Sequence, residues 1–366
     1  MLPQTTGDGT EVTSKVYERV IRHFNKSAIA IVTAVATLLL SACAQSDRDR
    51  NVDYISQKYA VPEDNQLILY TSHKEEVYLP IIREFESRTG IWVDVHAGGT
   101  TEMMRQAREA SEKGECDVMF GGGIESFEAQ KDLFMPYKTQ SSEQLDRTYA
   151  AFDNSWTVFT ELPIVFIYNK KLVRPSEIPR KWNDLFDEKW KGQIAFADIR
   201  NSGTSYTILF TMEQIIGEES ETLVPRFYEQ LGDNILDSSR EVIPYVSDGT
   251  YLIGITLEET AKKYIAMGYD IALIYPEDGT SAIPDGCAMV KNAPHSYNAG
   301  RFMDFVVGYD TQKYAMENFY RRPVRKDVEL SKAFGDTSFI RLDIKESAAK
   351  EEEVFKIWNE LEGGED

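Results

Sequence analysis

Apolar and polar residues alternate with two different periods between residues 65 and 125. Short apolar runs at 67–70, 91–95 and 116–120 have the length and aliphatic content of buried strands. Between them, apolar residues recur with a helical period, and Gly90 and Gly114 are well placed to end the two helices. The pattern predicts the order β-α-β-α-β and therefore a mostly parallel open sheet.

The loops that follow these strands, at 71–73, 96–101 and 121–123, are rich in Gly, Ser and Thr. Ligands of open parallel sheets lie beyond the carboxyl ends of the strands, so these loops should gather at one edge. The residues expected at this edge are Ser72, His73, Thr100, Thr101, Gly121 and Gly122. Plainer interpretations stay open: a surface turn for the first pair, a helix cap for the threonines and a strand-to-helix turn for the glycines.

The middle of the chain repeats this alternation. Further strands are predicted at 162–168, 194–197, 251–255, 271–275 and 288–290. One predicted helix opens with Ser202, Gly203, Thr204 and Ser205, and the free N–H groups and hydroxyls of such a helix start suit an anion. An ordinary Ser/Thr cap is the alternative.

Three acids are expected on the opposite side of the ligand. Asp248, Glu258 and Glu259 would accept hydrogen bonds from hydroxyls or an amine, and we expect one true ligand contact among them. Alternatively, they cap the helix that begins near Glu258, because acids favour helix N-termini.

The N-terminal segment differs from the rest. Basic residues precede an uncharged apolar run at 28–40, which at about 13 residues is short for a membrane span but suits a signal-peptide core. The run ends in Leu-Ser-Ala-Cys43, which resembles a bacterial lipobox, with Cys43 as the lipidation site; a weak signal anchor is the alternative. We therefore expect a lipoprotein signal peptide at 1–43 and a flexible polar tether at 44–64.

Charge and cysteine content narrow the function. A formal net charge of -20 argues against nucleic-acid binding, although it leaves a local anion site possible. Beyond Cys43 only Cys116 and Cys287 remain, which do not make a disulfide framework. Both lie in apolar runs and are interpreted as buried thiols, with a single bridge between them left open.

Several motifs occur along the chain in a characteristic order and spacing: Leu69-Tyr70-Thr71-Ser72-His73, Phe85-Glu86-Ser87-Arg88-Thr89-Gly90, Asp117-Val118-Met119-Phe120-Gly121-Gly122, Trp182-Asn183-Asp184-Leu185-Phe186, and Tyr275-Pro276-Glu277-Asp278-Gly279-Thr280-Ser281 with Pro284-Asp285-Gly286. Together they resemble the bacterial extracellular solute-binding family that includes ferric-ion, phosphonate and sugar-phosphate binders. The resemblance implies an α/β, two-lobed periplasmic-binding-protein fold of type II. Each lobe would be a mixed open sheet flanked by helices, and two crossover strands would form the hinge.

The resemblance also implies boundaries and partners. The crossings would fall near 162–169 and 271–278, with lobe 1 at 65–165 and 280–366 and lobe 2 at 166–279. The protein would be a monomer outside the cytoplasm, anchored by lipid to the bacterial membrane, and would deliver a small anionic ligand from the interlobe cleft to the permease of an ABC importer.

The ligand branch depends on one departure from the family pattern. Ferric-ion binders resemble one another in using a first-loop His, an acid and two adjacent tyrosines as ligands. His73 matches the first position, but Leu257, Glu258 and Glu259 stand where the tyrosines are expected. We therefore expect an organophosphate or phosphonate ligand, such as a sugar phosphate or 2-aminoethylphosphonate. Ferric ion is the alternative ligand. We expect neither a metal site nor a cofactor alongside the organophosphate or phosphonate.

Catalysis is not expected. Glu258 and Glu259 are neighbours on a helix and point about 100° apart, which is poor geometry for two carboxylates flanking one glycosidic bond. The sequence has no nucleophile elbow, P-loop, HxH, HExxH or CxxC spacing. A membrane-tethered sensor or adhesin stays an alternative. The basic run at 321–325 is interpreted as a solvated stretch near the C-terminal part of the fold.

Overall fold

The computed structural model describes residues 61–363 apart from 147, 149, 150, 152, 234 and 336. The predicted signal peptide, the lipidation site Cys43 and most of the predicted tether lie outside the described residues. The chain divides between Glu63 and Asp64, and the unit that begins at Asp64 contains the two lobes described below. A short 3-10 helix, η1 (Glu63–Asn65), stands at the boundary.

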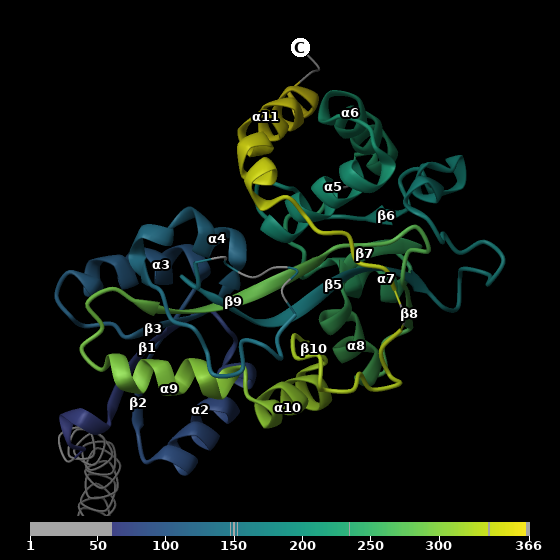
Figure 1. Cartoon of the computed structure of the whole chain (residues 1–366). Coiled ribbons are helices and arrows are strands. Elements are labelled where there is room, and N and C mark those ends of the chain that lie inside the picture. Colours follow the sequence, from purple (N-terminus) through teal and green to yellow (C-terminus); the bar gives the residue numbers. More distant parts are fainter. Residues whose placement is uncertain are drawn as a thin grey trace, which may run out of the picture. The chain divides into compact units, whose positions relative to one another are not determined.

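Lobe 1 is built on the predicted β-α-β-α-β unit. Strands β1 (Gln66–Thr71), β2 (Trp92–Ala97) and β3 (Val118–Gly123) are parallel, in the order β2-β1-β3. Helices α2 (Glu75–Thr89) and α3 (Thr100–Ser111) form the crossovers (Figure 1). Antiparallel β9 (Ala282–Val290) extends the sheet, so the lobe is mixed as expected.

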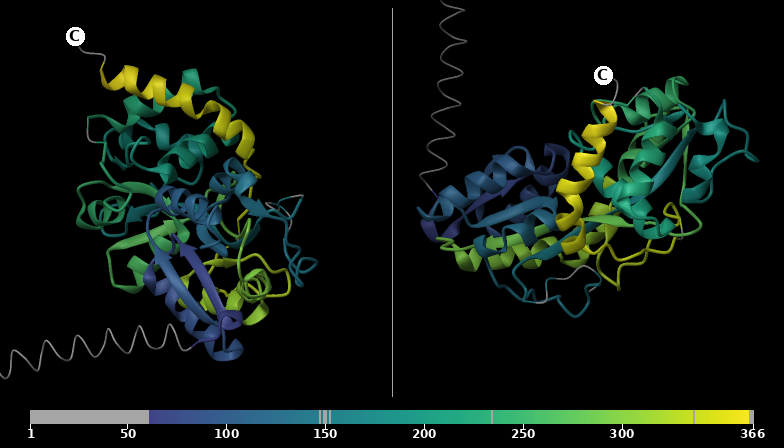
Figure 2. Two further views of the ribbon diagram at one scale, coloured as in Figure 1. Left: turned by 90° about the vertical axis from the view of Figure 1, so that its left-hand side faces the viewer. Right: turned by 90° about the horizontal axis from the view of Figure 1, so that it is seen from above.

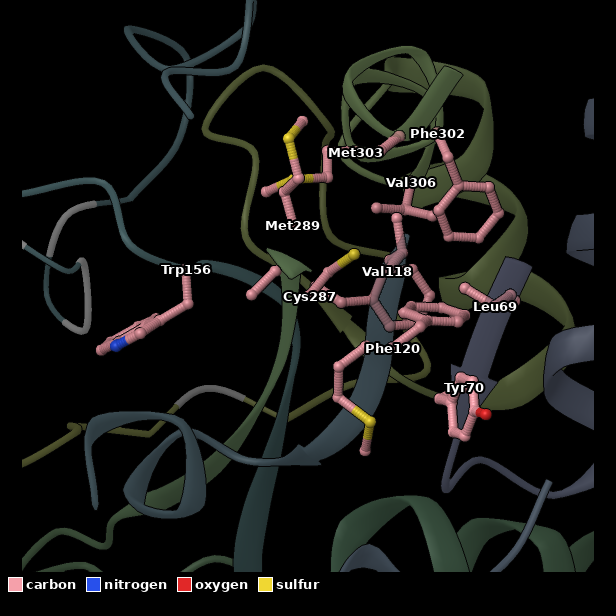
Figure 3. Close-up of a cluster of buried hydrophobic side chains, with 14 of the residues drawn as sticks. Leu69, Tyr70, Val118, Phe120, Trp156, Cys287, Met289, Phe302, Met303 and Val306 are labelled. Atoms are coloured by element: carbon pink, nitrogen blue, oxygen red, sulfur yellow. The ribbon is translucent and has the colours of Figure 1, made fainter. Parts of the chain in front are cut away.

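Smaller elements complete lobe 1. These are α4 (Ile124–Ala129), η2 (Lys131–Leu133), β4 (Phe134–Met135), α9 (Ser296–Val306) and α10 (Tyr309–Phe319). The hydrophobic core of the lobe lies between its sheet and helices, where Leu69 and Phe120 meet Phe302 and Val306 (Figure 3). Cys287 belongs to the same core, and both Cys116 and Cys287 are buried free thiols rather than a bridge. Burial raises the pKa of each thiol.

Lobe 2 has its own mixed sheet and its own core. It contains β6 (Ile194–Ala195), β7 (Ile253–Leu257) and β8 (Ile271–Ile274). Its helices are η3 (Trp182–Phe186), η4 (Glu188–Trp190), α5 (Gly203–Ile216), α6 (Ser220–Leu231), α7 (Val242–Asp248) and α8 (Glu258–Ala266). Aromatic packing of Trp182 on Phe166 and of Phe196 on Phe227 fills the space beneath the helices. The two-lobed fold class predicted from the sequence is confirmed.

The lobes are joined by the long strand β5 (Thr157–Asn169). Its residues 157–163 pair with β9 in lobe 1, whereas residues 164–169 pair with β7 and β8 in lobe 2. The second connection runs from the end of β8 to the start of β9, through residues 275–281.

The C-terminal segment adds a further connection between the lobes. Short β10 (Arg322–Pro323) pairs with β5, and Thr280 bridges to Phe339 beside the hinge. Helix α11 (Ile344–Glu362) then packs on α5 and α6 and also touches α4 of lobe 1. The right-hand view of Figure 2 shows α11 running between the helices of the two lobes. Its buried Val354 and Trp358 join the lobe 2 core, although the expected boundary grouped residues 280–366 with lobe 1.

Candidate functional site

The directions of the strands bring the polar loops of both lobes to the point where β5 passes from lobe 1 to lobe 2. In lobe 1, β3 ends at Gly123, which pairs with Asp285 of β9 near the lobe boundary. In lobe 2, β7 ends at Leu257, which pairs with Ile164, the first residue of β5 to pair within lobe 2. Strand β6 is parallel to β7, so it ends at the same edge. The carboxyl ends of both sets of parallel strands therefore face the interlobe site.

Lobe 1 brings together most of the residues predicted for its edge. A Cβ placed on Gly122 would lie 3.4 Å from Thr100 Oγ1 and 3.5 Å from Ser72 Oγ, and one on Gly121 would lie 2.9 Å from His73 Cδ2. Both glycines have positive φ, 98° and 95°, which disfavours any other residue. They belong to the end of β3 rather than to a loop after it. Thr101 is exposed and follows Thr100 in the first turn of α3.

The N-terminus of α3 is the part of this edge best suited to an anion. Its cap residue is Gly99, and no side chain of the described residues caps the first turn. The half-buried Ser72 and Thr100 place hydroxyl groups beside Gly122, which contacts both. Backbone N–H groups, the positive end of the helix dipole and two hydroxyls thus converge on one small region. We call Ser72, Thr100, Gly122 and the start of α3 the lobe 1 cradle.

His73 lies beneath the cradle and is not a charged group. Its ring packs edge-on against Phe120 and Phe159, with centroid distances of 4.4 and 5.6 Å. Burial lowers the pKa of His73 to about 4; the carboxylate of Asp285 opposes this shift and Arg321 reinforces it. The imidazole is therefore neutral at pH 7, with Nε2 lying 3.7 Å from Asp285 Oδ2.

Arg321 and Arg322 are buried, so the interpretation of 321–325 as a solvated run was wrong for these two residues. Arg321 Nη1 donates to Thr160 Oγ1 at 3.1 Å and also to Asp285. Arg322 donates through Nε and Nη2 to the two carboxylate oxygens of Glu258, at 2.7 and 3.1 Å. Each guanidinium is held inside the protein because it neutralises a buried acid from a distant part of the chain.

The adjacent acids of α8 have different environments. Glu258 is fully buried, and both of its oxygens are already bonded inside the protein, to Arg322 and the Tyr275 hydroxyl. Glu259 is also buried, and Lys263 Nζ lies 2.7 Å from its Oε1. Although burial alone would raise it, the charges of Arg321 and Lys263 hold the pKa of Glu259 below its usual value. Its Oε2 accepts a hydrogen bond from Thr260 Oγ1 at 3.1 Å, so both Glu259 oxygens have a partner, and 11% of the side chain is exposed.

The same region contains an ion pair between the lobes. Lys263 Nζ, on α8 of lobe 2, lies 3.1 Å from Glu76 Oε1 on α2 of lobe 1. Lys263 thus contacts Glu259 and Glu76 at once. Lys263 therefore connects Glu259 to the opposite lobe.

The N-terminus of α5 is capped by the side chain of its own N-cap residue. Ser202 Oγ accepts the backbone N–H of Ser205 at 3.2 Å, which is the plain capping role that the sequence left open. Gly203 is exposed and Thr204 is half-buried, and the first turn carries no acid. The α5 N-terminus therefore faces the interlobe edge with a favourable dipole, but with one of its N–H groups already bonded.

Asp248 is the predicted site residue that the structure does not bring to this edge. It lies at the end of α7, before β7 begins, whereas Glu258 and Glu259 follow β7. Its Oδ1 accepts hydrogen bonds from Thr250. The adjacent Gly249 lies against Leu172 and Asn169, at the far end of β5. Amino and carboxyl ends of a strand are opposite edges of a sheet, so Asp248 lies away from the other residues.

Two further features concern residues 61–363 with the gaps given above. No group of three or more His, Cys, Asp and Glu side chains in this range is arranged to hold a metal ion. No helix in the same range has both the length and the apolarity that a membrane span requires.

Comparison with known proteins agrees with this architecture. Iron uptake protein A1 of Synechocystis sp. is 26% identical over 329 residues, covering 85% of this chain and 89% of that protein. Among solved structures, the ferric binding protein from Campylobacter jejuni has a TM-score of 0.70 at 23% identity, covering 81% of this chain and 99% of its own. The periplasmic binding protein AfuA from Actinobacillus pleuropneumoniae, with exogenous fructose-6-phosphate bound, has a TM-score of 0.67 at 21% identity, covering 81% and 98%.

The family assignment rests on a match to a family model. The family model described as bacterial extracellular solute-binding protein matches residues 115–345, which is more than half of the chain. The matched range includes β3, the crossing strand β5, all of lobe 2 up to β8 and the buried arginines. The chain belongs to the bacterial extracellular solute-binding protein family, and it is a substrate-binding component of an ABC transporter rather than an enzyme.

Proposed function

We propose that the protein captures a small organophosphate or phosphonate, such as a sugar phosphate or 2-aminoethylphosphonate, between its two lobes. The observation that carries this proposal is the lobe 1 cradle. Ser72 and Thr100 meet at Gly122, beside a helix start that no side chain of the described residues caps. Phosphate and phosphonate oxygens take several N–H and O–H donors at once, which is what a helix N-terminus with flanking hydroxyls offers.

Lobe 2 supplies groups for the other end of such a ligand. Glu259 is ionised, because Arg321 and Lys263 lower its pKa, and it follows β7 at the interlobe edge. A carboxylate there accepts hydrogen bonds from the hydroxyls of a sugar or from the amine of an aminophosphonate. The start of α5, with no acid in its first turn, adds a second positive helix end.

Ferric ion is the competing ligand, and two of the proteins compared above are named for iron. The charge distribution in this chain favours the anion. Arg321 donates to Asp285 and interacts electrostatically with both His73 and Glu259, so a guanidinium already neutralises the acids around His73. A trivalent cation brought beside Arg321 would be repelled by its charge and would find no tyrosine pair after β7.

Location and partners follow from the same proposal. Membership of an extracellular family supports a position outside the cytoplasm. We propose further that Cys43 anchors the protein by lipid to the bacterial membrane and that residues 44–64 let the folded unit reach its permease. The protein acts as a monomer in this account.

A thermal-shift screen of the purified protein tests the ligand class. The panel contains glucose 6-phosphate, glycerol 3-phosphate, 2-aminoethylphosphonate, inorganic phosphate and ferric citrate. A bound ligand stabilises the native state by RT ln(1 + [L]/Kd), so a tight ligand raises the melting temperature clearly. We expect one organophosphate or phosphonate to produce the shift. A shift with ferric citrate alone would reject the proposal.

Variants then locate the site. Thr100→Val and Ser72→Ala each remove one hydroxyl from the cradle and should weaken binding of the identified compound about 10-fold or more, since hydrogen bonds to charged groups contribute about 1.5–3 kcal/mol. Asp248→Ala is the matched control, because Asp248 lies at the opposite edge of the lobe 2 sheet. Equal losses in all three variants would show that the cradle has no special role.

A further inference from the structure

Two buried nitrogen atoms at the interlobe crossing have no hydrogen-bond partner in the described part of the chain. They are Nε of Arg321 and Nε2 of His73. Both side chains are more than nine-tenths buried, with exposed fractions of 9% and 5%. A buried charged donor without an acceptor is costly, so such a site normally has an acceptor in its functional state.

The orientation of Arg321 is fixed by its other contacts. The residue follows Tyr320, which ends α10 in a left-handed conformation with φ of 56°, and it precedes β10. Its Nη1 donates to Asp285 on β9 and to Thr160 on β5, the two strands that meet beside the hinge. The guanidinium is therefore held in place through Nη1. Its Nε lies elsewhere on the same rigid plane and is oriented by this anchor.

The surroundings of Arg321 place it between the two lobes. Its charge acts on His73, which follows β1 in lobe 1, and on Glu259, which follows β7 in lobe 2. His73 in turn lies against Gly121, the neighbour of Gly122 in the cradle. His73 and Arg321 thus share the carboxylate of Asp285, and His73 connects this pair to the cradle.

We propose that Arg321 is a ligand-recognition residue, which binds the oxyanion of the captured solute through Nε while His73 Nε2 lies beside it. This inference rests on the proposed function and deepens it. The cradle holds the oxyanion from the start of α3, and Arg321 supplies the full positive charge that hydroxyls and backbone N–H groups lack. Guanidinium groups suit phosphate, phosphonate and carboxylate oxygens, because their planar donors match two acceptors at once.

A different role for Arg321 is that of a counter-charge for Asp285 alone. The variant Arg321→Lys separates the two roles. A lysine retains the positive charge beside Asp285 but has no Nε–H edge on a planar fork. If Arg321 recognises the ligand, this variant should keep its melting temperature and lose affinity; if Arg321 is only a counter-charge, affinity should be unchanged.

The experiment is isothermal titration calorimetry of the wild-type protein, Arg321→Lys and Arg88→Lys with glucose 6-phosphate, 2-aminoethylphosphonate and β-alanine. Arg88 is a surface arginine paired with Glu84 and Asp310, so its replacement is the matched control. We expect the compound that binds wild type to lose affinity about 10- to 100-fold in Arg321→Lys, the range given by one hydrogen bond to a charged group. Arg88→Lys should bind like wild type.

A second readout works on the unaltered protein. The Nε–H resonance of Arg321, assigned by its absence in Arg321→Lys, should move on addition of the binding compound. Unchanged affinity of a folded Arg321→Lys protein, or an Nε–H signal that does not respond to a bound compound, would overturn the inference. Binding of β-alanine alone, with loss in Arg321→Lys, would retain Arg321 and reject the phosphorus-containing ligand class. A wild-type protein that binds neither these three compounds nor any phosphorus-containing compound of the thermal-shift panel would reject both the inference and the proposed function.

Discussion

Replacing Arg322 by methionine should be among the most damaging single changes in this protein. Glu258 is fully buried, and its two oxygens accept from Arg322 Nε and Nη2 at 2.7 and 3.1 Å. The variant removes both guanidinium hydrogen bonds of this carboxylate and leaves Lys262 Nζ, 3.9 Å away, as its counter-charge, although the Tyr275 hydroxyl stays in contact. Breaking a buried ion pair from one side costs about 3–5 kcal/mol, because the remaining charge is not solvated.

The magnitude can be followed by heat or by denaturant. Unfolding entropy of about 2.1 cal/mol/K per residue, applied to a unit of about 300 residues, converts this cost into a melting point lower by about 5–8 °C. The double variant Glu258→Gln/Arg322→Met removes both charges, so it should recover much of the loss. Urea unfolding with an unchanged m-value gives the free energy directly. A single variant within about 1 kcal/mol of wild type would refute the reasoning, as would a double variant less stable than the single one.

Two further predictions concern pH and the C-terminal helix. The pKa of His73 is about 4 in the folded protein and about 6.5 in the unfolded protein. The unfolded state therefore binds more protons between pH 4 and pH 6.5. For this reason the free energy of unfolding should fall by up to about 3 kcal/mol as the pH drops from 6.5 to 4. Urea unfolding at several pH values should show a shallower loss in His73→Gln; parallel curves for the two proteins would contradict the assignment. Trp358→Ala should cost about 3–5 kcal/mol in chemical unfolding, because Trp358 is 1% exposed in the lobe 2 core. The exposed Lys356→Ala should stay within about 0.5 kcal/mol of wild type, and equal losses in both variants would mean that α11 is not part of that core.

The parts of this account that could be predicted from sequence are those governed by local patterns. Alternating apolar runs and helical periods identified the β1-α2-β2-α3-β3 unit, and the position of each loop after a strand brought Ser72, Thr100 and Gly122 into one expected group. The positive φ of Gly122 explains why glycine stands there. The strand order β2-β1-β3 was not predicted, because pairing of successive strands alone would give β1-β2-β3.

Other features depend on pairing between distant residues, which a single sequence does not display. Arg321 is bonded to Asp285, 36 residues away, and Arg322 to Glu258, 64 residues away, so two internal ion pairs looked like one solvated basic run. A signal was present in the two adjacent acids after β7, which need counter-charges if they are buried. Asp248 was predicted beside these acids, but it lies on the amino side of β7, which local patterns do not reveal.

Calorimetric titration of the wild-type protein with ferric citrate and, separately, with the organophosphates and phosphonates of the thermal-shift panel tests the central claim most directly. The account predicts that one phosphorus-containing compound binds with a stoichiometry of one per chain, and that ferric citrate produces no binding heat. Stoichiometric binding of ferric ion, with no heat from any phosphorus-containing compound, would contradict it. In that case His73 and Glu259 would have to leave their contacts with Arg321 and act as metal ligands.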